Sequence, residues 1–175
     1  MRVFARRGLG GARHSEIAKE AQVSVPTVFF YFPTREALVK AVLEEVARFL
    51  TAMVSSIHDS PGPAPEAVLA LTKAFADSVD THPDYVRVWL DWSTAIREEI
   101  WPLYLEFEDN VVSIIADRIR RWQRARGMSD EEAEDDARLV VGSAHMIAQM
   151  KFTRCAPEKV DRFLRTLVRS TLGNS

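Results

Sequence analysis

The sequence has few of the residues that build disulfides, metal sites or membrane spans. Cys155 is the single cysteine among 175 residues, which excludes an internal disulfide and a cysteine-based zinc site and is typical of a reducing cytoplasm. No stretch approaches the roughly 18 consecutive apolar residues of a transmembrane helix. No secretory signal pattern opens the sequence. We therefore expect a cytoplasmic protein that does not cross a membrane.

Patterns typical of catalysis and cofactor binding are also lacking. There is no glycine-rich phosphate loop, and the four histidines do not have the spacing of metal ligands. Paired acids such as Glu44 and Glu45 are adjacent, so they do not share a helix face. These absences predict a protein that is not an enzyme and has no cofactor and no metal site.

Helical periodicity dominates what the sequence does contain. Apolar residues recur every three or four positions nearly throughout, strand patterns are almost absent, and glycine or proline separates the periodic segments. The fold class predicted is all-α. The helices expected include 14–21, 25–32, 34–57, 65–80, 83–96, one reaching 126, one opened by a capping box at 129–132 and running to 153, and one from 156 to before 173. We predict two domains, 1–50 and 51–175.

Charge is unevenly distributed between these two domains. The net charge is −2, but residues 1–50 hold eight Lys or Arg against five Glu, and the remainder holds fifteen against twenty acids. A basic head on an acidic body is compatible with a local phosphate-binding surface. The arginines near 118–126 and the acids near 130–134 instead complement helix dipoles and need no function.

Residues 15–38 have the pattern of two short helices joined by a tight turn, followed by the capped start of a third helix. Ser24 is positioned to cap the second helix, in which Val25, Val28 and Phe32 are spaced to pack inward. Four side chains then lie on or near its outer face, where small and hydroxylic groups suit close approach to DNA: Pro26, Thr27, Phe30 and Tyr31. Thr34 caps the next helix and places Arg35 where a phosphate could lie. An ordinary helical hairpin with a solvated face is the alternative.

Several segments resemble known DNA-binding regulators. Ile17-Ala18, Ala21–Ser24, Thr27–Phe32 and Arg35–Leu38 are similar to the helix-turn-helix signature of TetR-family transcriptional regulators. Within that family the segments 4–8, 23–29, 88–93 and 97–103 resemble the quorum-sensing master regulators of the HapR/LuxR type. The resemblance implies a three-helix DNA-binding head on a larger helical body that binds ligand and dimerises.

The resemblance also implies residue roles. Thr27, Tyr31 and Arg35 would contact the phosphate backbone, while Pro26, Thr27 and Phe30 would lie nearest the bases. Position 30 often carries Asn in the subgroup, and Phe cannot make the bidentate contact with adenine that Asn makes, although its ring can touch a thymine methyl group. Base specificity should therefore differ or depend more on DNA shape. The resemblance further implies that the chain begins inside its first helix.

The body has side chains suited to a small-molecule cavity. Aromatic, methionine and a few polar residues recur at helical spacing and are expected to face inward. They are Leu71, Phe75, Trp89, Trp92, Ser93, Ile96, Val111, Ile115, Met146, Gln149 and Met150. A filled core explains the same residues, and both interpretations remain open. The family resemblance favours a pocket for a small hydrophobic ligand.

The last two helices have amphipathic stripes. These can cover the chain's own core or meet their copies across a two-fold axis. The residues of a candidate dimer interface are Leu139, Gly142, Ser143, Ile147, Val160, Phe163, Leu164 and Leu167. The family resemblance favours the homodimer.

The function predicted is a homodimeric DNA-binding transcriptional regulator, a repressor or activator, which binds a pseudo-palindromic double-stranded operator. A ligand in the body would change the separation of the two heads. The alternative is a helical small-molecule-binding protein with weakened or lost DNA binding.

Overall fold

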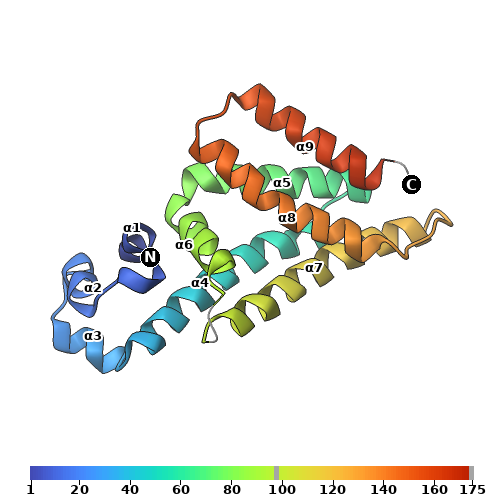
Figure 1. The fold of residues 1–175 in the computed structure, drawn as a ribbon. Helices are drawn as coiled ribbons and strands as arrows, with labels where there is room; N and C mark the ends of the chain where they lie inside the picture. Colours follow the sequence, from blue (N-terminus) through green and yellow to red (C-terminus); the bar gives the residue numbers. More distant parts are fainter. Residues whose placement is uncertain (97–98, 174–175) are drawn as a thin grey trace. The chain divides into compact units, whose positions relative to one another are not determined.

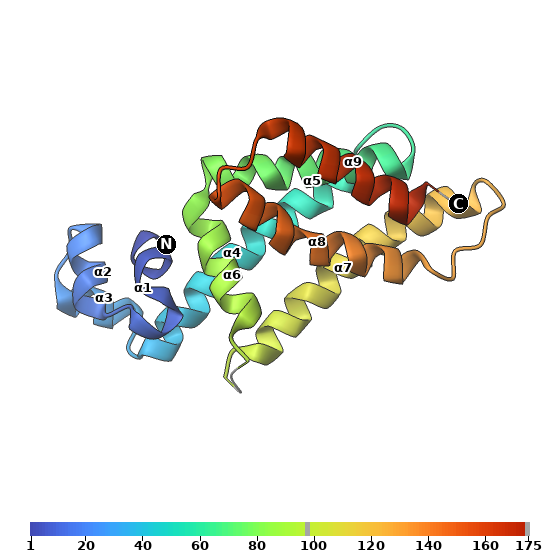
Figure 2. The same ribbon diagram turned by 45° about the horizontal axis from the view of Figure 1, so that its top comes forward.

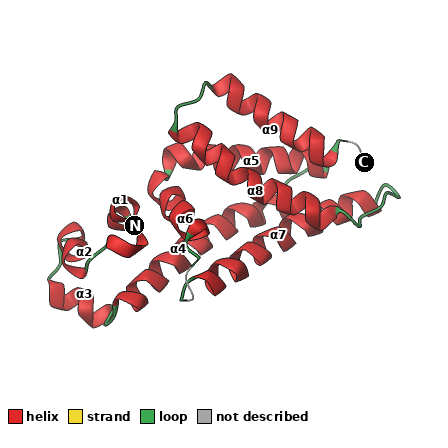
Figure 3. Ribbon diagram, viewed as in Figure 1, coloured by secondary structure: helices red, strands yellow, loops and turns green. Residues whose placement is uncertain are grey.

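The computed structural model describes residues 1–96 and 99–173. Every regular element in these two ranges is helical, which confirms the all-α prediction (Figure 3). The elements are α1 (Arg2–Gly11), α2 (His14–Ala21), α3 (Val25–Tyr31), α4 (Arg35–Ser55), the short 3-10 helix η1 (Ser56–His58), α5 (Ala64–Thr81), α6 (Pro83–Thr94), α7 (Trp101–Arg124), α8 (Ala133–Phe152) and α9 (Pro157–Leu172).

Local capping explains where several of these helices begin. The backbone N–H of Thr27 donates to Ser24 Oγ at 3.2 Å, and that of Ala37 donates to Thr34 Oγ1 at 3.1 Å. Both predicted caps are thereby confirmed. Proline opens α6 and α9 in the first turn, where its missing N–H is not needed.

One predicted helix start is wrong. The capping box expected at 129–132 does not form, because α8 begins only at Ala133. The Ser129 hydroxyl instead accepts from the N–H of Glu131, two residues on, at 3.4 Å. This local turn competes with the helical cap for the same hydroxyl oxygen.

The chain divides into two compact units. The first unit contains residues 1–49 together with residues 82–104, and the second contains residues 50–81 together with residues from 105 onward. The first unit thus includes α6 and the start of α7, in addition to the first 49 residues. The functional division at residue 50 stays a prediction.

In the first unit, α1 packs against α6 and α2, and α2 packs against α3 (Figures 1 and 2). The helix α1 is broken at Gly8, which has φ 72° and ψ 167°. Trp92 is almost fully buried and its indole Nε1 donates to the carbonyl of Ile100 at 3.2 Å. Other buried apolar residues include Val3, Phe4, Leu9, Ala18, Val28, Leu38, Leu43, Val46, Val86 and Trp89.

In the second unit, α5, α8 and α9 pack against one another, as both ribbon views show (Figures 1 and 2). Apolar residues of α5, α7, α8 and α9 form one continuous core with the end of α4. Its members include Val54, Ile57, Val68, Leu71, Val111, Ile115, Ile119, Ala137, Val140, Val168 and Leu172. None of the described helices is both long and apolar enough to cross a bilayer.

Candidate DNA-binding site

The helices α2 and α3 meet through a tight left-handed turn. Gln22 takes φ 56° and ψ 38°, and the N–H of Val23 donates to the carbonyl of Ala18 at 3.0 Å. Ala18 of α2 and Val28 of α3 are buried, with exposed fractions of 2% and 5%. Because helices of eight and seven residues are too short to be stable alone, these tertiary contacts fix the helix-turn-helix.

A histidine ties the start of α2 to the far end of α3. The His14 ring stacks on the Phe29 ring with centroids 4.1 Å apart and an interplanar angle of 1°. Its Nε2 donates to the carbonyl of Phe32 at 3.0 Å. This role of His14 was not predicted from the sequence, since nothing local in the sequence indicates a partner eighteen residues away.

The outer face of α3 carries most of the residues predicted to meet DNA. Phe30 and Tyr31 are 80% and 69% exposed, and Pro26 is also exposed. The predicted inward packing is right for Val28 and wrong for Val25, which is 37% exposed. Val25 is the first residue of α3 and borders a surface hollow instead of the core.

The hydroxyl groups of α3's first turn are already engaged. Ser24 Oγ and Thr27 Oγ1 share a hydrogen bond of 2.7 Å, and Thr27 is half-buried. Its predicted contact with DNA stays a prediction. The exposed Tyr31 ring meets that of Phe30 edge to face, with centroids 5.2 Å apart.

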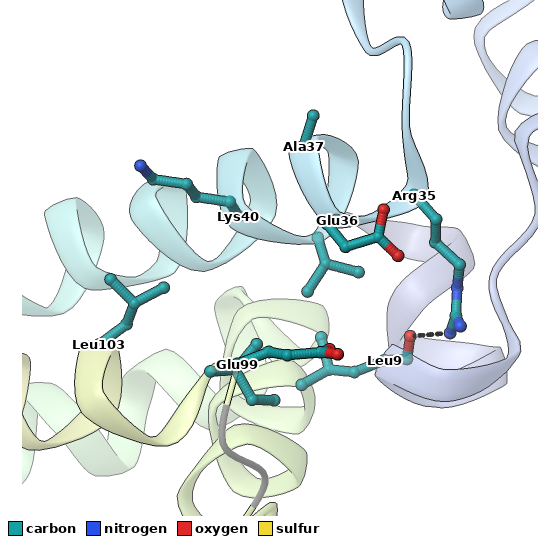
Figure 4. A pocket seen from close by; sticks show the side chains of 9 residues that line it. Leu9, Arg35, Glu36, Ala37, Lys40, Glu99 and Leu103 are labelled. Carbon is teal, nitrogen blue, oxygen red and sulfur yellow. Dashed lines mark hydrogen bonds between the residues drawn. The ribbon is translucent and has the colours of Figure 1, made fainter.

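The start of α4 brings Arg35 against the break in α1. Arg35 Nη2 donates to the carbonyl of Leu9 at 2.7 Å (Figure 4). The N–H of Leu9 donates to Asp91 Oδ2 at 2.6 Å. Leu9 itself is only 2% exposed. The backbone of one buried residue is therefore bound on one side by α4 and on the other by α6.

Gly8 permits this arrangement. Its φ of 72° is one that residues with a Cβ rarely adopt. A Cβ at this position would also lie 3.2 Å from Asp91 Oδ2. Glycine thus lets the backbone turn sharply and lets the carboxylate of Asp91 reach the N–H of Leu9.

Several basic residues of the head are neutralised by α2. Arg2 and Arg6 form ion pairs with Glu20, and Arg7 pairs with Glu16. The two arginines hold the pKa of the Glu20 carboxyl below its usual value, Arg6 through a hydrogen bond that is the largest cause. The net positive charge of residues 1–50 is therefore not all available for phosphate.

Arg13 and Lys19 are exposed and make no ion pair with any residue that the structure describes. Arg13 borders a surface hollow of about 490 Å³ that runs from Gly10 to Ser15 and is closed by Val25, Phe29 and Arg35. Cationic side chains beside such a concavity suit a phosphate group. Arg13 is not among the residues predicted for the site from the sequence.

A second hollow, of about 230 Å³, lies beside the start of α4 (Figure 4). Leu9, Val39, Ile100 and Leu103 form its apolar wall, and charged side chains of α4 and Glu99 form its rim. The backbone N–H of Glu36 and the hydroxyl of Thr34 hold the pKa of the Glu36 carboxyl below its usual value. None of the residues predicted for a ligand pocket lines this hollow.

Comparison with known proteins identifies the family. The chain is 35% identical over 173 residues to the HTH-type transcriptional regulator LuxR of Vibrio harveyi, and the match covers 98% of this chain and 82% of LuxR. Residues 1–42, which include the whole helix-turn-helix, match the family model described as bacterial regulatory proteins, tetR family. The chain belongs to the TetR family of transcriptional regulators.

Solved structures share the fold of this TetR-family chain. A protein of Clostridium perfringens assigned as a fatty acid metabolism regulator has a TM-score of 0.79 at 15% identity, covering 99% of this chain and 94% of its own. A TetR/AcrR-family regulator of Thermobifida fusca has a TM-score of 0.63 at 16% identity, covering 98% of this chain and 91% of its own. The predicted membership of the TetR family and the likeness to LuxR are confirmed.

The residues predicted for a ligand pocket are divided between the two units. Trp89, Trp92, Ser93 and Ile96 belong to the first unit and the others to the second. Trp89, Trp92, Leu71, Phe75, Val111 and Ile115 are buried, and Ser93 and Met150 are half-buried. Ile96 is 77% exposed at the end of its segment, Met146 is 47% exposed, and Gln149 is exposed, so these three do not face inward as expected.

Two residues that follow the predicted pocket residue Ile96 in the sequence are not described by the structure. Arg97 and Glu98 of the segment that resembles the HapR/LuxR type lie outside the described residues. No group of three or more potential metal ligands occurs among the residues that are described. Whether the buried members enclose a ligand stays a prediction.

The residues predicted for a dimer interface fall on two faces of α8 and α9. Leu139 is 59% exposed and Gly142 is also exposed, whereas Ser143, Phe163 and Leu167 are half-buried. Ile147, Val160 and Leu164 are buried in the second unit. The last three already pack within the chain, and the other five remain exposed or half-buried. Their place in a dimer interface stays a prediction.

Proposed function

We propose that this TetR-family regulator is a homodimer that places α3 in the DNA major groove. The observation that carries this proposal is the helix-turn-helix geometry, in which α3 is fixed by its cap and by His14 while Phe30 and Tyr31 project outward. A short helix held in this way by its partner is the arrangement that reads base edges in DNA-binding proteins. DNA as partner implies that the protein acts in the bacterial cytoplasm.

Phosphate contacts would flank the helix. Thr34 and Arg35 open α4, where backbone N–H groups and a guanidinium lie together. One Arg35 nitrogen is bound to Leu9, and a guanidinium has five N–H donors, so donors remain for a phosphate. Tyr31 would donate its hydroxyl to a phosphate on the same side, and Ser24 would hold the N-terminus of α3 in place.

We propose the exposed face of α8 and α9 as the dimer interface. Leu139 and Met146 lie on α8 seven residues apart and are 59% and 47% exposed, and the exposed Gly142 between them permits close approach of a second helix. Large exposed apolar groups on one helix face are typical of surfaces that bury another chain. A two-fold dimer would place two copies of α3 about 34 Å apart, one turn of DNA.

We also propose that a small hydrophobic ligand in the body controls this dimer. The buried side chains of Leu71 and Phe75 and the half-buried Met150, all in the second unit, are of the kind that lines adaptable cavities. A ligand would act by binding more tightly to one arrangement of the two heads than to the other. The direction of control, repression or activation, follows from where the operator lies in a promoter.

The test of DNA binding is a titration of the purified chain on promoter DNA at several salt concentrations. A specific complex should form, and its affinity should fall as salt rises, because bound cations are released from the phosphates. Arg35→Ala should reduce the slope of log K against log salt by about one unit. Lys40→Ala is the matched control: Lys40 is an exposed cation on the next turn of α4 that lies 3.8 Å from Glu44, and its removal should leave the slope unchanged.

Absence of a specific complex would overturn the DNA-binding proposal. A small molecule retained by the purified protein and found by native mass spectrometry would then favour the alternative, a helical ligand-binding protein that has lost DNA binding. Sedimentation analysis tests the dimer separately. Leu139→Glu should shift the protein toward monomer, whereas Ser113→Glu, on the exposed side of α7, should not.

A further inference from the structure

The side chains of α3 restrict how this protein can read bases. Its seven residues, Val25–Tyr31, contain no charged and no amide side chain. Arginine, lysine, asparagine, glutamine and the acids are the residues that recognise base edges by directed hydrogen bonds. Hydrogen-bonded readout from this helix is therefore left to two hydroxyl groups.

Neither hydroxyl is well placed to read a base alone. Thr27 is half-buried and its Oγ1 shares a hydrogen bond with Ser24 Oγ. Tyr31 is the last residue of α3, at the end that leads to the start of α4 and its candidate phosphate contacts. The chemistry that α3 offers to the floor of the major groove is thus apolar.

Phe30 is the side chain that projects this apolar surface. It is 80% exposed, more than any other large hydrophobic residue described in the chain. Its neighbour Phe29 is less exposed, at 46%, and one face of its ring is stacked on His14. The Phe30 ring has the Tyr31 ring at its edge, with centroids 5.2 Å apart and an interplanar angle of 88°, which restricts its orientation.

We propose that Phe30 selects thymine by packing against its 5-methyl group. In the major groove the thymine methyl is the apolar group among the hydrogen-bonding edges of the four base pairs. Burying a methyl against an aromatic ring removes apolar surface of both from water. This inference rests on the proposed function and names the base feature that α3 reads in each half-site.

The probe is a DNA duplex that the protein selects from a pool of random sequences. Each duplex in the pool is about 30 base pairs long, enough for two half-sites one DNA turn apart. The selected duplex is then synthesised twice, once with thymine and once with deoxyuridine at every thymine position. Uracil pairs as thymine does and lacks only the methyl group. The wild-type chain should bind the uracil duplex about fourfold more weakly for each methyl that Phe30 contacts, since a buried methyl contributes about as much as one CH₂ group.

Two variants attribute the effect to Phe30. Phe30→Ala should bind the thymine and uracil duplexes with equal affinity, because the ring that senses the methyl is gone. Tyr31→Phe keeps both rings and should retain the thymine preference while weakening both complexes alike. Because Phe30 is so exposed, the Phe30→Ala chain should melt at the same temperature as the wild type, which circular dichroism checks.

The outcomes separate the two proposals. Equal wild-type affinity for the two duplexes overturns the inference while leaving DNA binding intact. A thymine preference that persists in Phe30→Ala overturns it as well, since another residue or the stiffness of the DNA would then be responsible. If no duplex is enriched from the pool, DNA binding itself fails and the inference falls with it.

Discussion

The two units of this chain differ in the interactions that stabilise each of them. In the first unit, directed polar contacts reach across the sequence to short helices: Asp91 and Arg35 bind the backbone of Leu9, and His14 binds the carbonyl of Phe32. In the second unit, long helices share one continuous apolar core. Buried backbone groups need hydrogen-bond partners, and in the first unit side chains from other helices supply several of them.

The polar contacts of the first unit differ in how much they contribute to its stability. The ion pairs of Arg2, Arg6 and Arg7 are exposed on the arginine side, and such surface pairs contribute little to stability. The bonds to Leu9 involve backbone groups of a residue that is 2% exposed. A buried N–H without a partner has a large cost, so these are the bonds on which the head depends.

The largest expected effect tests the core of the second unit. Ile119 has no exposed surface, and Ile119→Ala would remove buried methyl and methylene groups and leave a cavity. We expect the free energy of unfolding to fall by about 2–5 kcal/mol, measured by urea denaturation followed by circular dichroism. Ser113→Ala, on the exposed side of the same helix, should change it by less than about 0.5 kcal/mol. Equal losses in the two variants would contradict an apolar core as the main source of stability there.

The next effect tests the head. Asp91→Ala should leave the N–H of Leu9 buried without an acceptor and destabilise the first unit by about 1–3 kcal/mol. Hydrogen exchange should rise in α1 and in residues 34–38 and stay unchanged in α9. Asp91→Asn retains a carbonyl oxygen as acceptor and should recover most of the loss. An Asn variant as damaged as the Ala variant would show that the charge, and not the hydrogen bond, matters.

A smaller effect is expected at the cap of α3. Ser24→Ala removes the acceptor for the N–H of Thr27 and should destabilise the head by about 1 kcal/mol. DNA affinity should fall in parallel, because fraying at the start of α3 disorders the surface that carries Phe30. Ser24→Asp keeps an acceptor and should preserve the melting temperature. An unchanged melting temperature in Ser24→Ala would mean that packing alone positions α3.

The smallest effect comes from a carboxylate in the second unit. Asp136 is 9% exposed on α8, and burial, with Glu132 and Asp135 nearby, raises its pKa. The folded state therefore disfavours the ionised form, and Asp136→Asn should stabilise the protein at pH 7, by about 0.5 kcal/mol. This advantage should shrink as the pH falls through the raised pKa of the folded state and vanish only below the usual value of about 3.9, where the acid is protonated in both states. Paired urea titrations at pH 7 and at about one pH unit below that usual value measure the difference.

Local chemistry made most of the fold predictable. Helical spacing, the caps at Ser24 and Thr34 and the proline at position 83 identified the helices, and the helix-turn-helix followed from residues that are close in sequence. The failures arose where local signals compete: Ser129 has the right neighbours for a capping box, yet its hydroxyl binds a nearer N–H. Val25 has the spacing of an inward residue, but the first position of a short helix is poorly covered.

The parts of the site that escaped prediction join distant segments. Leu9 and Asp91 are eighty-two positions apart, and the sequence of neither position indicates that a backbone N–H will need a carboxylate from α6. His14 and Phe32 are a second example. The outward direction of Phe30, by contrast, was predictable, because it depends only on the helical register of α3.

The discontinuity of the first unit has a practical consequence for dissecting the protein. A fragment that ends near residue 50 would contain the whole helix-turn-helix and still lack the carboxylate that holds Leu9 and the helix on which α1 packs. Such an excised head would expose the apolar side of α1 and would be prone to aggregate. A minimal DNA-binding fragment that can be expressed separately would need residues 82–104 joined to residues 1–49 by a new linker.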